Sequence, residues 1–148
     1  MAVAEPQFDD LYREIILDHY RRPRNRGELA TPSQRVEGVN PVCGDEIHLD
    51  LEIGDDTIRD VSYWGHGCSI SQSSASMLTE RLKGCSIEEA ERVMGKVRAM
   101  LIDGAIPDDD IGDLQALEGV ARLPVRVKCA LLCWNVLKEG LQQATTAA

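Results

Sequence analysis

The sequence predicts an α+β fold, in which a small antiparallel sheet of about three strands packs against several helices. Residues 46–53 alternate apolar and polar side chains, the pattern of a strand with one buried face. Other segments place apolar residues at helical spacing, and these are residues 8–20, 69–84, 86–101 and 124–144. A chain of 148 residues with 43% hydrophobic residues can bury one core. We therefore expect a single domain over residues 1–148, with about six frayed residues at each end.

The predicted sheet is built around a hairpin. After the turn "GDD", the segment "TIRDVSYW" at residues 57–64 returns as the second strand. A short strand at residues 36–39 would complete the sheet. The apolar side chains of the first hairpin strand share one side, and they are Ile47, Leu49, Leu51 and Ile53.

The helical segments carry end signals. The helix at residues 8–20 stops before Pro23, and Gly84 ends the next helix. Ser86 and Glu89 have the spacing of a capping box at the start of the third helix.

The segment before the last helix is predicted to be mostly irregular. The loop "DGAIPDDDIGD" at residues 103–113 leads to a short helix near residues 114–117. Pro124 suits the first turn of the last helix, which continues through Ala144.

Composition narrows the classes of function. With 16 basic and 25 acidic residues the net charge is -9, which argues against nucleic acid as a partner. No apolar stretch approaches the roughly 20 residues of a membrane span, and the N-terminus lacks the features of a signal peptide. We therefore expect a soluble, cytoplasmic protein with no membrane partner. In that compartment five cysteines, an odd number, favour metal binding or catalysis over disulfides.

One basic cluster interrupts this acidic chain. Residues 21–26, "RRPRNR", carry four arginines directly after the first predicted helix, and the remainder of the chain carries -13 without their +4. A solvated helix end favoured by the helix dipole is the simpler interpretation. A docking patch for an acidic partner is the alternative.

Three cysteines fall at junctions between predicted elements. Cys43 lies in the loop "NPVCGDE" at the mouth of the hairpin. Cys68 lies in "GHGCS", where the second strand gives way to a helix, and Cys129 lies in the opening turns of the last helix. Loops and helix N-termini expose functional groups, and Cys43 and Cys68 flank one hairpin. Their loops can therefore meet at one end of the sheet.

The residues around Cys43 indicate a missing cation. Nearby carboxylates disfavour the thiolate, so Cys43 should be inert at neutral pH unless a positive charge lies beside it. A metal ion held by thiolates, with Asp45 as an oxygen ligand, would supply that charge, and zinc suits such donors. Three thiolates and one carboxylate around a divalent ion sum to about -2, so cationic neighbours are needed. Arg126 and Lys128, just before Cys129, could provide them.

Other ligands remain open at this point. His66, two residues before a cysteine, could replace the carboxylate as fourth ligand. Cys133, one turn after Cys129, could be a spare ligand, although a buried small hydrophobe is the simpler interpretation. Cys85 is most simply a small residue at a helix start, and the serines of "SISQSSAS" indicate close helix packing rather than a nucleophile.

Four segments closely resemble the SufU family of iron-sulfur cluster biogenesis proteins, relatives of the IscU scaffolds. They are "LYREIILDHYRRPRNRG", "NPVCGDEIHL", "GHGCSISQSSASMLTERLKG" and "LPVRVKCALLCW", within a match over residues 8 to 140. The resemblance implies the IscU/NifU N-terminal type of α+β fold. The metal-site motif of the family falls on Cys43, Asp45, Cys68 and Cys129, which implies one zinc ion per chain.

One position separates the two branches of the family. IscU-type scaffolds carry a histidine directly before the last cysteine, whereas this chain has Lys128, a protonated side chain and a poor ligand. The segment "IPDDDIGDLQALEG" also resembles the insertion of SufU-type members. The resemblance implies a zinc-dependent sulfurtransferase that takes persulfide sulfur from a pyridoxal-phosphate (PLP) cysteine desulfurase of the SufS type and stimulates it. Cys43 would accept the sulfur, Arg126 would steer its thiolate, and the downstream iron-sulfur assembly machinery would receive the product. The alternative is an iron-sulfur cluster scaffold.

Overall fold

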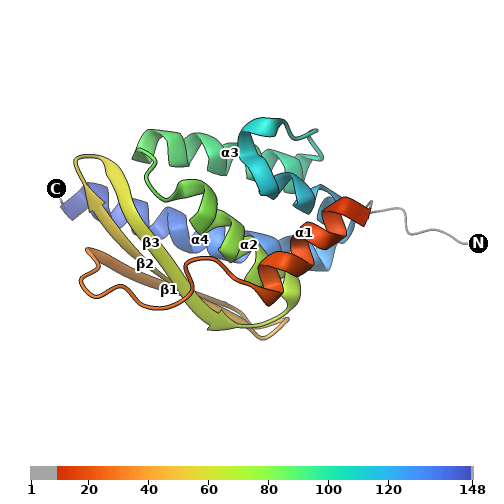
Figure 1. The fold of residues 1–148 in the computed structure, drawn as a ribbon, viewed down its shortest axis with the longest axis horizontal. Helices are drawn as coiled ribbons and strands as arrows, with labels where there is room; N and C mark the ends of the chain where they lie inside the picture. The colour runs from red at the N-terminus through yellow and green to blue at the C-terminus, as the bar shows by residue number, and fades with distance from the viewer. Residues whose placement is uncertain (1–9, 148) are drawn as a thin grey trace, which may run out of the picture.

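A computed structural model, which describes residues 10–147, confirms the predicted α+β architecture (Figure 1). The strands β1 (Gln34–Asn40), β2 (Asp45–Gly54) and β3 (Thr57–His66) form one antiparallel sheet in the order β1-β2-β3. The helical elements of the described residues are α1 (Asp10–Arg21), α2 (Ser69–Leu82), α3 (Ile87–Asp103), the 3-10 segment η1 (Asp109–Arg122) and α4 (Pro124–Ala147).

The predicted hairpin is confirmed, with a two-residue turn between β2 and β3. Asp55 and Asp56 both have positive φ, 54° and 58°, as a type I′ turn requires, and this turn matches the twist of the strands. The first strand, β1, is longer than the predicted residues 36–39. It pairs with β2 from Gln34 to Asn40, which carries the sheet to the loop that holds Cys43.

Helices α4 and α2 pack on the sheet, α4 mainly along β1 and β2 and α2 mainly along β3. Ile47, Leu49 and Leu51 of β2 have no exposed surface. Two glycines allow α4 to approach closely. A Cβ added to Gly38 of β1 would lie 2.6 Å from Val136 of α4, and one added to Gly140 of α4 would lie 2.7 Å from Leu51.

The serine-rich helix α2 lies between α1 and α4. Four of its serines are buried, and each of their hydroxyl groups has a hydrogen-bond partner; they are Ser71, Ser73, Ser74 and Ser76. Ser73 Oγ donates to the carbonyl of Ile16 in α1 at 2.8 Å, and Ser74 Oγ donates to the carbonyl of Ala130 in α4 at 2.7 Å. Ser76 Oγ accepts the backbone N–H of Arg24 at 2.9 Å. The predicted packing role of this segment is therefore confirmed, and hydrogen bonds form part of the packing.

The connection between α3 and α4 differs from the prediction. The second half of the loop predicted over residues 103–113 is helical, as part of η1. Asp108 caps η1 by accepting the Asp110 N–H at 3.0 Å. Lys96 of α3 reaches Asp108 at 3.0 Å, and Arg92 of α3 reaches Asp110 at 2.6 Å. An acidic run is typical of a solvated loop, but here it pairs with cations of a neighbouring helix, which no local pattern indicates.

The helix ends largely follow the predictions. Ser86 Oγ accepts the Glu89 N–H at 3.0 Å and so caps α3. Pro124 opens α4, which continues to Ala147, past the predicted end; fraying of the last residues stays a prediction. The predicted frayed N-terminal residues, and residues 8 and 9 of the first predicted helix, lie outside the described part. Among the described helices, none combines the length and the apolar character needed to cross a bilayer.

Candidate metal centre

Cys43 lies in the four-residue loop that joins β1 to β2. The strands end at the pair Asn40 and Asp45, and the Asn40 carbonyl accepts the N–H groups of Cys43 at 3.2 Å and of Gly44 at 2.8 Å. Gly44 has φ 74°, a left-handed conformation that glycine adopts without strain. This turn leaves Cys43 half-buried at the end of the sheet, whereas Asp45 is only 1% exposed.

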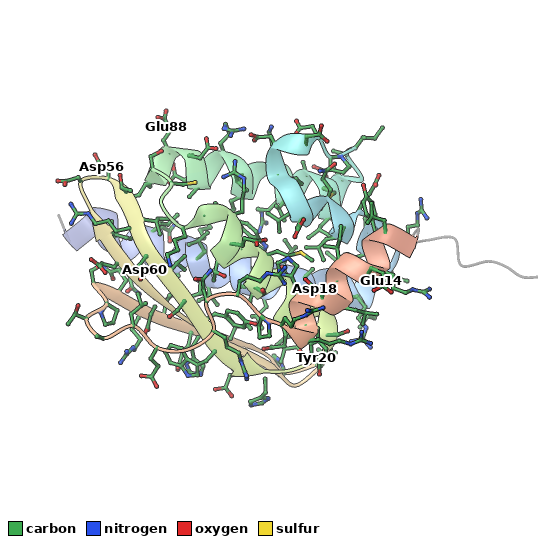
Figure 2. All side chains as sticks on the ribbon, in the orientation of Figure 1. Glu14, Asp18, Tyr20, Asp56, Asp60 and Glu88 are labelled. Carbon is green, nitrogen blue, oxygen red and sulfur yellow. The ribbon has the colours of Figure 1, made fainter. Side chains whose placement is uncertain are left out.

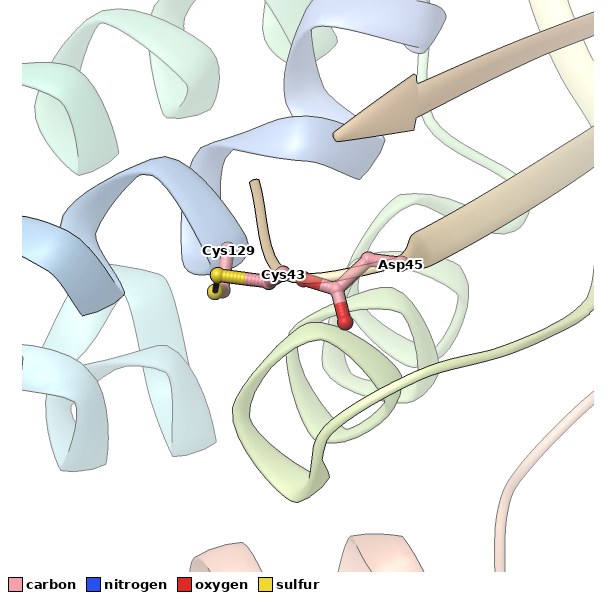
Figure 3. Close-up of side chains that lie close together, drawn as sticks. All are labelled: Cys43, Asp45 and Cys129. Atoms are coloured by element: carbon pink, nitrogen blue, oxygen red, sulfur yellow. Dashed lines mark hydrogen bonds between the residues drawn. The ribbon is translucent and has the colours of Figure 1, made fainter. Parts of the chain in front are cut away.

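Helix α4 brings Cys129 to the same loop. The Sγ atom of Cys129 lies 3.2 Å from the Sγ atom of Cys43. One ligand atom each from Cys43, Asp45 and Cys129 lies within 4.8 Å of the others. Figure 3 shows the two sulfur atoms side by side and the carboxylate close by at the start of β2. Residues that are more than 80 positions apart thus form one cluster.

Cys68 joins this cluster through Asp45. Its backbone N–H donates to Asp45 Oδ1 at 2.8 Å, and its Sγ lies 3.9 Å from Asp45 Oδ2. Cys68 is also the N-cap of α2, and its sulfur accepts the Ser71 N–H at 3.5 Å. The partial positive charge of the helix N-terminus therefore faces this thiol. All four predicted ligand residues gather at one end of the sheet, with Cys68 beside the tight group of Cys43, Asp45 and Cys129.

The two predicted cations are placed differently. Arg126 Nη1 lies 4.0 Å from Cys129 Sγ. Its hydrogen bond to Cys129, and the nearby charges of the other site thiols, raise the pKa of Arg126. Lys128 is exposed, and its side chain has no hydrogen bond or ion pair with a described residue; it lines a surface hollow with Asn40 and Val42. Arg126 is therefore the cation of this pair that faces the sulfur atoms.

Burial opposes ionisation of the innermost thiol. Cys129 has no exposed surface, and burial together with hydrogen bonds to Cys43, Asp45 and Cys68 raises the pKa of Cys129 above its usual range. In the protein alone Cys129 is therefore a neutral thiol at pH 7. A thiolate at this position requires more positive charge than Arg126 provides.

The alternative ligands lie outside this cluster. His66 is 73% exposed and its Nε2 pairs with Glu46 Oε1 at 3.3 Å. Cys133 is fully buried, and burial raises the pKa of Cys133 to about 12, as for a small hydrophobe. Cys85 accepts from Arg81 Nη1 at 3.3 Å. Among the described residues, neither of the two alternative ligands belongs to the close group of ligand atoms around Cys43, and nor does Cys85.

Sequence reasoning missed one residue at the site. Asn40 is 8% exposed, and its Nδ2 lies 3.9 Å from Cys129 Sγ. Its Oδ1 accepts the Val42 N–H at 3.3 Å. Asn40 thus joins the Cys43 loop to α4. Its place as the first residue of "NPVCGDE" was the signal, but only the packing of α4 on β1 shows that its side chain reaches the sulfur.

A second group of potential ligands lies away from this centre. His19 of α1 is buried, and its Nε2 lies 2.8 Å from Asp113 Oδ2 and 3.5 Å from Glu80 Oε1. The other ring nitrogen lies 2.7 Å from Ser76 Oγ. These contacts join α1, α2 and η1, so the group is explained as a structural tie between helices.

Comparisons with known proteins identify the family. Residues 11–144 match the family model described as the NifU-like N terminal domain. The chain belongs to this NifU-like family. It is 45% identical over 135 residues to the zinc-dependent sulfurtransferase SufU of Bacillus subtilis, a match that covers 90% of each chain. It is 36% identical over 146 residues to the iron-sulfur cluster assembly scaffold protein IscU of Streptococcus pyogenes, covering 98% of this chain and 91% of the relative. The resemblance to the SufU family is thus confirmed.

Solved structures of the NifU-like family agree with this fold. FiSufU of Fervidobacterium islandicum AW-1 superposes with a TM-score of 0.81 at 34% identity, covering 86% of this chain and 94% of that one. The N-terminal NifU-like protein of Brucella abortus superposes with a TM-score of 0.86 at 22% identity, covering 95% and 98%. The second likeness supports the fold alone.

The donor set of this NifU-like domain fits zinc. Three sulfur donors and one carboxylate suit a borderline-soft ion with tetrahedral coordination. Two thiolates on one tetrahedral zinc lie about 3.8 Å apart, from a Zn–S distance of about 2.3 Å. The 3.2 Å between the Cys43 and Cys129 sulfur atoms is about half an ångström shorter than that separation. Small shifts of these two side chains would therefore bring their sulfur atoms to the spacing that zinc requires.

Proposed function

We propose that this protein is a zinc-dependent sulfurtransferase that accepts sulfur from the persulfide of a PLP-dependent cysteine desulfurase of the SufS type, and stimulates that enzyme, in iron-sulfur cluster assembly. One observation carries the proposal: Cys43, half-buried on a loop, lies 3.2 Å from the fully buried Cys129 in a cluster that also contains Asp45. The 45% identity to a protein named a zinc-dependent sulfurtransferase supports it. We propose the cytoplasm as its compartment, because the accepting group must remain a reduced thiol.

Cys43 is the acceptor in this proposal because it is the more accessible thiol of the close pair. Its thiolate attacks the outer sulfur of the donor persulfide. A sulfur–sulfur bond forms at Cys43, the bond within the donor breaks, and the donor cysteine leaves as a thiolate. The transferred sulfur keeps its oxidation state, so no external oxidant or reductant takes part.

The residues around Cys43 would hold its thiol in place and keep it ionised. Cys43, Asp45, Cys68 and Cys129 would bind one zinc ion, which supplies the positive charge that keeps thiols ionised near neutral pH. Asp45 fixes the start of α2 through the Cys68 N–H. Arg126, 4.0 Å from Cys129 Sγ, adds a permanent positive charge on the α4 side and offsets part of the negative charge of the ligands.

A cluster scaffold is the second candidate, favoured by the 36% identity to a protein named an IscU scaffold. The same thiols could hold iron. The exposed Lys128, directly before Cys129, favours sulfur transfer because its ammonium group is a poor metal ligand. A purely structural zinc is the third possibility.

Metal analysis combined with persulfide trapping separates these functions. The purified chain would be analysed for metal, incubated with a PLP-dependent cysteine desulfurase and cysteine, and examined by mass spectrometry after alkylation. We expect about one zinc per chain and one labile sulfur atom on Cys43, with Cys85→Ser as an unaffected control. An iron chromophore would indicate a scaffold, and zinc without sulfur uptake would indicate a structural metal.

A further inference from the structure

The four arginines that follow α1 divide into two kinds. Arg22 pairs with Asp18 at 3.1 Å, and Arg24 pairs with the same carboxylate at 2.7 Å. Arg21 and Arg26 have no ion pair with any described residue. Asp18, labelled near the end of α1 in Figure 2, and Glu80, whose carboxylate lies 3.5 Å from Arg24, thus pair with one half of the cluster, whereas the other half has no such acidic partner. The cluster cannot therefore be treated as one uniformly solvated patch.

The two arginines without ion pairs line the same hollow. It has a volume of about 300 Å³ and lies between the end of α1, the end of β3 and the first turn of α2. Its walls include Tyr20, the nearly buried Tyr63 and His66. The helix dipole explains a cation at Arg21, in the last turn of α1, but not at Arg26, which lies beyond the helix. Arg26 instead bridges to Tyr63 of β3, and its Nη2 lies 3.4 Å from the Gly65 carbonyl, which places the side chain at the hollow.

The hollow adjoins the metal centre. Gly65, His66 and Gly67 form one wall, and Cys68 follows directly. Gly67 packs so closely on Asp45 that an added Cβ would collide with Asp45 Oδ1. A protein that reaches the thiols of the centre can therefore also place a side chain in the hollow. On a chain of net charge -9, two arginines without ion pairs in a concave site next to the reactive thiols form a site for a negative group.

We propose that this hollow binds an acidic side chain of the desulfurase that delivers sulfur to Cys43, through Arg21 and Arg26. This inference rests on the proposed function. A carboxylate fits the site because a planar guanidinium can bind it through two parallel hydrogen bonds. Tyr20 and the buried Tyr63 also line the hollow, and water screens a charged contact less in such a concave site than on a flat surface. The contact orients the partner so that its persulfide approaches the thiol cluster.

The test compares two charge-reversed double variants in binding to a PLP-dependent cysteine desulfurase. Arg21→Glu with Arg26→Glu changes the hollow. Arg59→Glu with Arg98→Glu is the matched control, because it changes the net charge equally at residues that lie outside the hollow. The Kd of each complex would be measured by calorimetry at low and high salt, together with zinc content and thermal unfolding.

We expect the hollow variant to weaken binding about tenfold at low salt, the effect of roughly 1.4 kcal/mol, and to keep its zinc. The loss should shrink at high salt, because about 1 M salt screens charges beyond roughly 3 Å. The control should bind like the wild type. An unchanged Kd in the hollow variant, or an equal loss in the control, would overturn the inference.

Two further readings separate this inference from the proposed function. If the wild type binds the desulfurase but takes up no sulfur, the sulfurtransferase proposal fails, while the Kd comparison still decides the role of the hollow. If inorganic phosphate binds the wild type with micromolar affinity, that binding is lost in the hollow variant and the desulfurase Kd does not change, the hollow is a site for a small free anion. That result would overturn the proposed partner.

Discussion

Asp45 gives the sharpest test of the metal centre, because it has one role in the structure, as a hydrogen-bond acceptor, and a second role in the proposed zinc site, as a ligand. It is 1% exposed, its Oδ1 accepts the Cys68 N–H at 2.8 Å, and its carboxylate belongs to the tight group with Cys43 and Cys129. Asp45→Ala removes both the hydrogen bond and the ligand. Asp45→Asn keeps an oxygen acceptor of the same size and removes the negative charge. The two variants therefore separate positioning from metal binding.

The expected magnitudes follow from these contacts. Loss of a residue that only supports a metal ligand costs about 10- to 100-fold in metal affinity, so loss of a ligand should reach at least the upper end of that range. Asp45→Ala should also lose the hydrogen bond of a charged acceptor, worth roughly 1.5–3 kcal/mol in the metal-free protein. Asp45→Asn should lose zinc affinity with a smaller loss of metal-free stability. Three thiols remain in both variants, so zinc binding should weaken rather than disappear.

Competition between each variant and a zinc chelator measures the zinc affinity. Thermal unfolding without metal measures the loss of stability in the metal-free protein. His66→Ala is the matched control: its side chain is 73% exposed and paired with Glu46. We expect its zinc affinity to stay within about twofold of wild type, since an exposed ion pair contributes little. A loss of affinity confined to His66→Ala, with Asp45→Ala unchanged, would refute this ligand assignment.

Three further predictions concern acceptance, geometry and acid stability. Cys43→Ser should take up no sulfur while keeping its fold, whereas Cys129→Ser should lose zinc and thermal stability together. Persulfide trapping and metal analysis measure these effects. Sulfur uptake by Cys43→Ser at the wild-type level would contradict the prediction. Gly67→Ala should cost about 1–3 kcal/mol of unfolding free energy and weaken zinc binding. The new methyl group would collide with the Asp45 carboxylate, and the backbone φ of 150° is one that alanine rarely adopts. Gly95→Ala, where a Cβ meets nothing within 4 Å, should be neutral or stabilising in the same denaturation series. A hydrogen bond from an α3 arginine lowers the pKa of Asp110 from 3.8 to about 2, so its contribution to stability is present above about pH 4 and is lost as the pH falls toward about 2. Asp110→Asn should therefore flatten the fall of Tm in this window in metal-free protein, and an unchanged slope would count against the ion-pair cluster.

The parts of the fold that the sequence predicted were those with a local signal. Alternation over residues 46–53 and a turn rich in aspartate identified the hairpin, and Ser86 and Pro124 marked two helix starts. The positions of Cys43, Cys68 and Cys129 at junctions between elements predicted the metal centre, because the ends of strands and helices meet at one end of a small sheet. The order of elements, rather than any spacing between ligands, carried that prediction.

The parts that were missed depend on contacts between distant residues. The helical start of η1 depends on Arg92 and Lys96, which lie on another helix. The contact of Asn40 with Cys129, 89 positions apart, depends on how α4 packs on β1. The free charge of Arg21 and Arg26 becomes visible only once Asp18 is seen to pair with their neighbours.

The buried serines of α2 fix the rotation of this helix about its own axis more than they hold the helix against its neighbours. Apolar side chains tolerate a small rotation of a helix, but a hydroxyl hydrogen bond has a direction. A rotation by one residue, about 100°, would turn Ser73 and Ser74 away from carbonyls on opposite sides, and each unpaired hydroxyl would cost about 1–3 kcal/mol. The helix therefore has one angular setting, and that setting fixes the direction in which Cys68, its N-cap, points toward Asp45. An α2 core of alanine and leucine could hold together as firmly and still leave the sulfur pointing the wrong way.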